Sequence, residues 1–277
     1  MNFDKALRKI VPSAASLTYN PIIKRLLDIL DFIPRHIFSE FSNIPPNHLR
    51  IRIGAANRIF ANHVYYLNHA RDFWLHAFLS GLCRLDSQIL DIGCGCGRFA
   101  HHLRDYRFNH ESFTGRYIGI DIDVEMLNWC RRNFDSQRFQ FLRSSDMSKV
   151  YNVAEENDAA YALPIADSSI DFAFSTSLFT HLLEPELVNY CKESFRVLKQ
   201  GGSMAMYCFS MDHPPPSFGN RFTFGFKIGN SYVESMAVPE AAVAYEESFL
   251  FQVAHEAGFA TAEILLGDSQ PMLLCRK

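Results

Sequence analysis

Apolar positions follow a helical period in the first third of the chain and an alternating strand-and-helix pattern after it. In PIIKRLLDILDFI, residues 21–33, apolar side chains recur at intervals of three and four, which predicts an amphipathic helix. Pro45 and Pro46 restrict the backbone and remove two donors, so they predict a break. Apolar and aromatic positions over residues 55–82 fit one or two packed helices. We therefore expect residues 1–85 to form a helical N-terminal region.

The remainder of the chain alternates predicted strands and helices, which is typical of an α/β fold with a mostly parallel sheet. Asp123 suits the N-cap of one helix, and Gly258 suits the end of another. Residues 211–240 show no clear regular element. The expected strands are 89–92, 117–121, 139–142, 171–174, 203–209, near 260–266 and 271–276, and the expected helices are 98–103, 123–132, 184–199 and 245–257.

The composition excludes several classes of protein. Apolar residues make up 48% of the 277 residues, which supports a sizeable core. The 27 basic and 30 acidic residues nearly cancel, so there is no basic footprint for nucleic acid. No run of about 18 apolar residues predicts a transmembrane helix, and no secretory signal stands at the N-terminus. We expect a cytoplasmic protein.

The cysteines give no sign of a metal site. There are seven, scattered along the chain, and Cys94-x-Cys96 has the wrong spacing for a zinc knuckle. Free thiols indicate a reducing compartment. The cysteine spacing therefore does not favour a structural zinc site.

The stretch ILDIGCGCGRF, residues 89–99, places an acid and then spaced glycines directly after a predicted buried strand. Glycine permits positive φ and close approach of a ligand, and a helix N-terminus presents N–H groups to it. The candidate ligands are a dinucleotide, a nucleoside triphosphate and S-adenosylmethionine. The GxxxxGK[ST] motif of a P-loop is absent, and Arg98 stands where a dinucleotide fingerprint needs a small residue.

The pattern Asp91-x-Gly93-x-Gly95-x-Gly97 resembles motif I of the class I S-adenosylmethionine-dependent methyltransferases. Further stretches resemble that family in its order: YIGIDID its second motif, FLRSSDM the region after strand three, LPIADSSIDFAFSTSLFTHL the fourth-strand segment of the type 11 members, and FRVLKQGG the lead into strand five. The likeness covers roughly residues 85–210.

This resemblance implies a Rossmann-like, mostly parallel seven-stranded sheet with helices on both faces. The methyltransferase domain would span residues 86–277, with a lid insertion at about 211–244. Residues 1–85 would form a helical cap on the substrate side.

The resemblance also implies S-adenosylmethionine as cofactor, S-adenosylhomocysteine as product, and no metal. Asp121 would accept hydrogen bonds from both ribose hydroxyls, and Asp146 would face the adenine amine; the alternative for each is a turn or capping role. Arg98 either pairs with the methionyl carboxylate or lies solvated at the helix start. Carboxylates suit adenosine because it offers hydroxyl and amine donors. The expected cofactor-binding residues are Asp91, Gly93, Cys94, Gly95, Gly97, Arg98, Asp121, Ile122, Ser145, Asp146, Met147 and Ser175.

Methyl transfer from a sulfonium needs alignment and, for a hydroxyl acceptor, removal of a proton. His181 follows the predicted fourth strand, at the edge where open α/β sheets bind ligands, and is the expected catalytic base. The alternative is a histidine that packs beneath the substrate. His213 is a second candidate, whereas His101 and His102 are expected on a helix surface.

The acceptor is less defined by the sequence. Phe222, Phe224 and Phe226 predict either an apolar lid or one face of an edge strand. They favour a partly apolar small-molecule acceptor: a natural product, a lipid-like molecule or a sugar attached to one. We expect O-methylation; the alternatives are N-methylation, a partner protein that binds S-adenosylmethionine without catalysis, and an NAD(P)-dependent oxidoreductase, which Arg98 disfavours.

Overall fold

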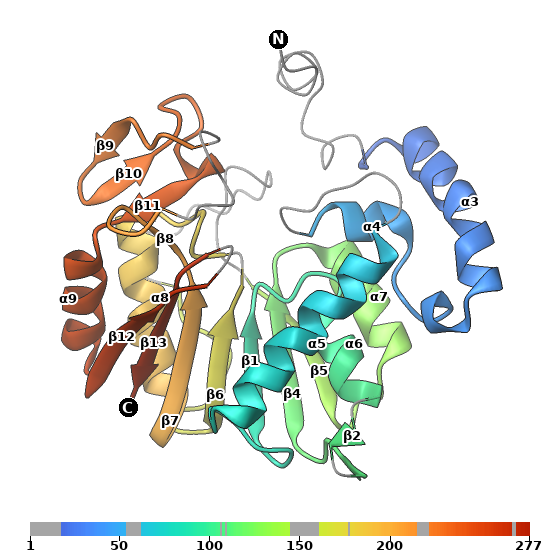
Figure 1. The fold of residues 1–277 in the computed structure, drawn as a ribbon, viewed down its shortest axis with the longest axis horizontal. Helices are drawn as coiled ribbons and strands as arrows, with labels where there is room; N and C mark the ends of the chain where they lie inside the picture. Colours follow the sequence, from blue (N-terminus) through green and yellow to red (C-terminus); the bar gives the residue numbers. More distant parts are fainter. Residues whose placement is uncertain are drawn as a thin grey trace.

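A seven-stranded sheet lies at the centre of the protein (Figure 1) in a computed structural model that describes residues 18–53, 62–105, 107–108, 110–144, 161–176, 178–214, 222–267 and 270–277. The strand order is β12-β13-β7-β6-β1-β4-β5, and neighbours are parallel except for β13, which is antiparallel to both β7 and β12. The strands are β1 (Gln88–Ile92), β4 (Arg116–Asp121), β5 (Phe139–Arg143), β6 (Ile170–Ser175), β7 (Leu198–Tyr207), β12 (Thr261–Leu265) and β13 (Met272–Arg276). The predicted α/β fold with a mostly parallel seven-stranded sheet is confirmed.

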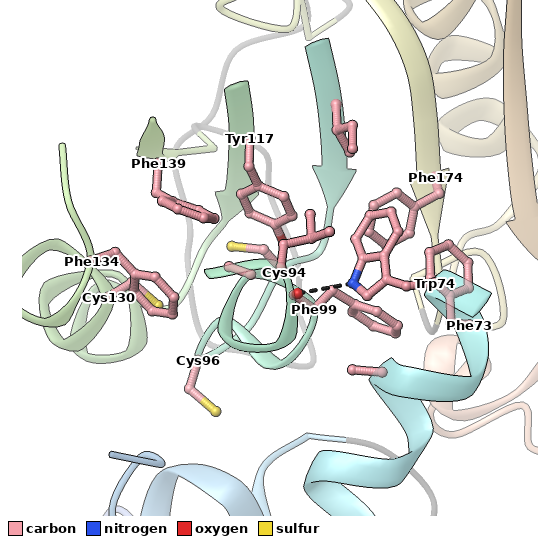
Figure 2. Packing of buried hydrophobic residues seen from close by; sticks show 14 of the residues in the cluster. Phe73, Trp74, Cys94, Cys96, Phe99, Tyr117, Cys130, Phe134, Phe139 and Phe174 are labelled. Carbon is pink, nitrogen blue, oxygen red and sulfur yellow. Dashed lines mark hydrogen bonds between the residues drawn. The ribbon is translucent and has the colours of Figure 1, made fainter. Parts of the chain in front are cut away.

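Helices cover both faces of this sheet because successive strand residues point to opposite sides. In β6, Phe172 and Phe174 belong to one hydrophobic core and Ala173 to the other. The first core also holds α5 (His63–Leu79), α6 (Arg98–Asp105) and α7 (Val124–Asn133), and the second holds α8 (Glu184–Val197) and α9 (Glu247–Ala257). Figure 2 shows the first core, where the Trp74 indole N–H donates to the Phe99 carbonyl at 3.0 Å. One core therefore extends across the expected boundary between residues 85 and 86.

Two predicted helix ends are confirmed and two are displaced. Asp123 accepts from the amides of Glu125 and Met126 as an N-cap, and Gly258 ends α9 at φ 109°. The helix predicted to reach residue 199 ends at Val197, because β7 already begins at Leu198 and pairs with β6. Tyr245, predicted as helical, lies in a strand opposite Ser210.

A second, four-stranded sheet lies beyond the carboxyl end of β7 (Figure 1). Its order is β8-β11-β10-β9, so the prediction of no regular element in residues 211–240 is wrong. Phe226 begins the edge strand β9, whereas Phe222 and Phe224 precede it and pack at a tilt against the Phe209 ring, with centroids 5.3 and 5.4 Å from its centroid. The strands of this second sheet are β8 (Phe209–Ser210), β9 (Phe226–Ile228), β10 (Ser231–Val233) and β11 (Val243–Tyr245), and the short helix η4 (Pro239–Ala241) comes between β10 and β11. The hairpin β2 (Arg107–Phe108)–β3 (Glu111–Ser112) forms a separate two-stranded sheet.

In the described part of the N-terminal region, the chain forms α3 (Pro21–Ile37), η1 (Ser39–Phe41) and α4 (Asn47–Ile51), followed by α5. The predicted helix from Pro21 is confirmed, and α4 begins directly after the proline pair because proline is tolerated where a helix starts. The Asp31 carboxylate joins these helices: it receives Arg50 Nη2 at 2.6 Å and lies 2.7 Å from His63 Nε2. No helix in the described residues is long and apolar enough to cross a membrane.

Candidate functional site

The loop between β1 and α6 requires glycine at three positions. Gly93, Gly95 and Gly97 have φ values of 86°, 53° and 75°, which side chains of L-residues rarely adopt. At Gly95 a Cβ atom would also lie 2.6 Å from the Cγ2 methyl of Ile53. The N-terminal region therefore contacts the middle of the glycine loop through Ile53.

The amides of this loop are largely used inside the protein. Gly93 and Cys94 donate to the Ile120 carbonyl at 2.8 and 3.0 Å, and Gly97 donates to the Cys94 carbonyl at 3.0 Å. The expectation that these N–H groups would be presented to the ligand is therefore wrong for these residues. Their hydrogen bonds hold the loop against the end of β4. A ligand could therefore pack closely against the glycine backbone without hydrogen-bonding to these amides.

Asp121, the last residue of β4, faces this loop with both carboxylate oxygens engaged. Oδ2 accepts from the Gly95 amide at 2.7 Å, and Oδ1 accepts from the Asp123 amide at 2.8 Å. Burial raises the pKa of Asp121, and these amide hydrogen bonds lower it. A carboxylate has about four acceptor positions, so Asp121 can still accept two hydrogen bonds from a ligand diol. Ile122, half-buried, continues the same edge.

Asp91 and Arg98 form a buried acid and a buried cation at the two ends of the glycine loop. Tyr117 donates its hydroxyl to Asp91 Oδ2, whereas Asp91 Oδ1 and Arg98 Nε and Nη1 have no hydrogen-bond partner among the described residues. Burial raises the pKa of Asp91 to about 7, while the Tyr117 hydrogen bond and the charge of Arg98 oppose that rise. Because Arg98 is 5% exposed, the alternative of a solvated arginine is wrong.

Arg98 can donate to a ligand carboxylate, and Asp91 can accept from a ligand ammonium. Arg98 lies over the rings of Tyr65 and Phe99, 5.9 and 5.2 Å from their centroids, so its position is fixed by packing. Ser175 ends β6, is fully buried, and its hydroxyl likewise has no partner in the described part of the chain. Unpaired buried polar atoms are costly in the free protein, and here they gather where β1, α6 and β6 meet.

Arg52 connects the N-terminal region to the start of α7 by two ion pairs. Its Nη1 lies 2.9 Å from Asp123 Oδ2 and its Nη2 lies 2.9 Å from Glu125 Oε2, with the guanidinium 4.0 Å from the Tyr19 ring centroid. Arg52 and Ile53 thus border the candidate site, and the sequence did not predict this. A single sequence cannot predict these ion pairs, because nothing in the residues around Arg52 indicates an acidic partner about 70 residues away.

His181 lies after β6, as predicted, where the chain is bonded to the second sheet. Its Nδ1 is 2.8 Å from the Glu240 carbonyl, and the neighbouring Thr180 carbonyl accepts from the Val243 amide at 2.8 Å. A carbonyl can only accept, so Nδ1 carries the proton of the neutral ring and Nε2 carries the lone pair. Burial lowers the pKa of His181, and backbone hydrogen bonds to Glu240 and Ala241 oppose this.

Two further histidines, His213 and His101, pair or pack within the fold. His213 Nδ1 pairs with Glu247 Oε1 at 2.6 Å beyond β8. His101 is buried, not on the helix surface as expected, and burial with Arg104 lowers its pKa to about 4. The predicted adenine-side residues Ser145, Asp146 and Met147 lie outside the described residues.

The cysteines and acids form no metal centre in the part of the chain that the structure describes. No group of three or more His, Cys, Asp or Glu side chains there has the geometry to hold an ion. All seven cysteines are buried free thiols, and Cys94 packs against Gly119, where a Cβ atom would lie 2.8 Å from its sulfur.

Comparison with known proteins supports the motifs. Residues 90–206 match the sequence profile of a methyltransferase domain family. Similar proteins include an uncharacterized methyltransferase of Mycobacteroides abscessus, 28% identical over 47% of this chain and 42% of that protein. The mitochondrial 2-methoxy-6-polyprenyl-1,4-benzoquinol methylase of Schizosaccharomyces pombe is 29% identical over 56% of this chain and 50% of that protein.

These similarities cover half or less of the relatives' own lengths. A solved structure from Pyrococcus horikoshii has the same fold, with a TM-score of 0.52, 18% identity, and coverage of 77% of this chain and 95% of that one.

Proposed function

Because the chain carries a class I S-adenosylmethionine-dependent methyltransferase domain, we propose that it methylates a hydroxyl oxygen of a small-molecule acceptor, with His181 as the general base. The cofactor assignment is supported by the buried polar atoms of Asp91 and Arg98 beside the glycine loop, which have no hydrogen-bond partner among the described residues. The assignment of His181 as the base is supported by its tautomer, which the hydrogen bond to the Glu240 carbonyl determines.

The described residues would suit the methionine end and the ribose of S-adenosylmethionine. Arg98 would hold the methionyl carboxylate, Asp91 Oδ1 would accept from the ammonium, and the free acceptor positions of Asp121 would take the ribose hydroxyls. From the sequence resemblance, Asp146 with Ser145 and Met147 would border the adenine. When bound, S-adenosylmethionine supplies a methyl group already activated by a sulfonium.

His181 would take the proton from the acceptor hydroxyl through Nε2. Burial lowers the pKa of its ring below the ordinary value of 6.5, so the ring is neutral near pH 7 and can accept a proton. The hydrogen bond from Nδ1 to Glu240 holds the ring and stabilises the imidazolium that forms. Proximity and alignment would supply the rest of the rate enhancement.

The acceptor would lie between the N-terminal cap and the second sheet. That sheet is fixed to the segment around His181: the Tyr245 hydroxyl donates to the Leu182 carbonyl at 2.8 Å, and the Glu184 amide donates to Ser231 Oγ at 3.0 Å. The ring cluster of Phe209, Phe222 and Phe224 gives the sheet an apolar side. A partly apolar acceptor suits it, and the Schizosaccharomyces pombe relative is named for a polyprenyl benzoquinol, a lipid-like molecule.

Methyl-labelled S-adenosylmethionine tests this proposal against matched acceptors. A panel would pair each polyprenyl phenol or apolar alcohol with its amine analogue and with an analogue whose hydroxyl is blocked. We expect label on the oxygen of hydroxyl acceptors and none on the blocked analogues. Label on the amines alone would indicate the alternative N-methyltransferase. Tight cofactor binding with no labelled product in any pair would indicate the alternative of a non-catalytic partner protein.

A further inference from the structure

Helix α3 turns its apolar face to solvent. Ile22, Ile33 and Ile37 are 71%, 62% and 67% exposed, and their spacing places them on one side of the helix. The same side or its borders carry further exposed apolar residues: Leu26, Ile29, Leu30 and Phe32. An amphipathic helix in a water-soluble domain normally buries this stripe, so the orientation of α3 needs a reason.

Ion pairs hold the polar face of α3 inward. The side chains of Asp31 and Arg50 are 2% and 1% exposed and lie 2.6 Å apart, and Asp28 pairs with His48 at 2.7 Å. Lys24 pairs with Glu125 in the first turn of α7. Turning α3 over would leave the Arg50 charge buried without its partner, which is strongly unfavourable. These pairs therefore hold α3 in the orientation that exposes its apolar stripe.

Two charged side chains beside the open stripe are Asp28, which is paired with His48, and Arg25, for which no ion pair is found among the described residues. Both acids of α3, Asp28 and Asp31, are thus paired. Arg25 is exposed beside the stripe, and the exposed His36 ring is stacked on Phe32 at 3.6 Å. An anionic surface would complement the Arg25 charge, whereas a second copy of the chain in parallel register would bring the two Arg25 side chains against each other.

We propose that α3 lies in the surface of an anionic lipid bilayer, with Ile22, Ile29 and Ile33 in the acyl boundary and Arg25 at the headgroups. A helix with a large apolar face and basic borders binds such a surface in its plane. Lys24 on α3 pairs with Glu125 at the start of α7, so α7 would lie close to the bilayer. The candidate cofactor site at Asp121, which lies just before α7, would then lie on the bilayer side of the protein. Binding itself does not depend on methyl transfer; only its use, delivery of a lipid-like acceptor, rests on the proposed function.

Co-sedimentation of the full chain with vesicles tests the inference. One vesicle preparation holds phosphatidylcholine alone, and the other holds phosphatidylcholine and phosphatidylglycerol in equal parts. We expect binding to the anionic vesicles, reduced at least ~tenfold by the double substitution Ile29→Glu, Ile33→Glu. Arg25→Gln should reduce it by about fivefold, since one basic residue near an anionic surface contributes about that much. Leu79→Glu, on the exposed end of α5, is the matched control and should bind as the wild type does.

Each variant is compared with the wild type in thermal unfolding, so that a loss of binding is not a loss of fold. No wild-type binding to anionic vesicles would overturn the inference, as would equal binding by the double variant. A dimer seen by light scattering that the double variant abolishes, without vesicle binding, would assign α3 to a second copy instead. Vesicle binding with no transferase activity would leave this inference standing and remove the proposed function.

Discussion

Replacing His181 with alanine should lower kcat by ~10²–10⁴-fold on a hydroxyl acceptor, because the proton would have no positioned base to accept it. Affinity for S-adenosylhomocysteine should change little, since His181 is bonded to Glu240 of η4 and not to the glycine loop. Steady-state kinetics on the acceptor found in the labelling panel would measure the first quantity, and calorimetry the second. His255→Ala, on the exposed side of α9, is the matched control.

The pH dependence of the wild-type rate should have the same origin. Only the neutral ring can take the proton, so kcat should rise with pH through the pKa of His181 and then level off. Burial lowers that pKa from 6.5, so the fall in rate should lie on the acid side of 6.5. A folded His181→Ala enzyme with near-normal kcat from about pH 6 to 9 would show that His181 only shapes the pocket. Retention of the rate by the variant at raised pH would indicate an amine or an acidic phenol as acceptor.

Replacing Asp121 with alanine should weaken S-adenosylhomocysteine binding by roughly 2–4 kcal/mol, about 30- to 1,000-fold in Kd. The variant would lose two charge-assisted hydrogen bonds to the ribose and also free the Gly95 amide, which Asp121 now holds at 2.7 Å. Asp121→Asn keeps the shape and one acceptor oxygen, so its loss should be smaller. Isothermal titration gives all of these affinities.

A distant acid separates this effect from a general change in charge. Asp105 pairs with its neighbour Arg104 at the end of α6, and Asp105→Ala should leave the affinity unchanged. Thermal unfolding of each variant would show whether the loop and β4 remain folded. An Asp121→Ala protein that is folded and binds S-adenosylhomocysteine as tightly as the wild type would place Asp121 outside the site.

The local and periodic features were predictable from the sequence. Glycines at intervals of two after a buried strand fixed the position of the loop, and the N-cap Asp123 and the terminator Gly258 act through residues within one helical turn. The order of the motifs predicted which strand ends meet, since the carboxyl ends of parallel strands share one edge. Asp91, Arg98, Asp121 and Ser175 do gather there.

Features that depend on long-range partners were not predictable. The parallel pairing of Tyr245 with Ser210 overrode the helical pattern, because a strand partner far along the chain decides that conformation. The period of α3 predicted an amphipathic helix but not which face would be inward, because Asp31 pairs with Arg50, 19 residues away. The ion pairs of Arg52 and the contact of Ile53 with Gly95 likewise depend on a fold that brings these segments together.

Calorimetric titration of the full chain with S-adenosylhomocysteine, in parallel with NADH, tests the account most directly. A glycine loop that ends in Arg98, a buried acid at Asp91 and a diol acceptor at Asp121 predict saturable binding of S-adenosylhomocysteine at one site. They predict no binding of NADH at the same concentrations, because Arg98 stands where a dinucleotide needs a small residue. Binding of NADH without binding of S-adenosylhomocysteine would contradict the account.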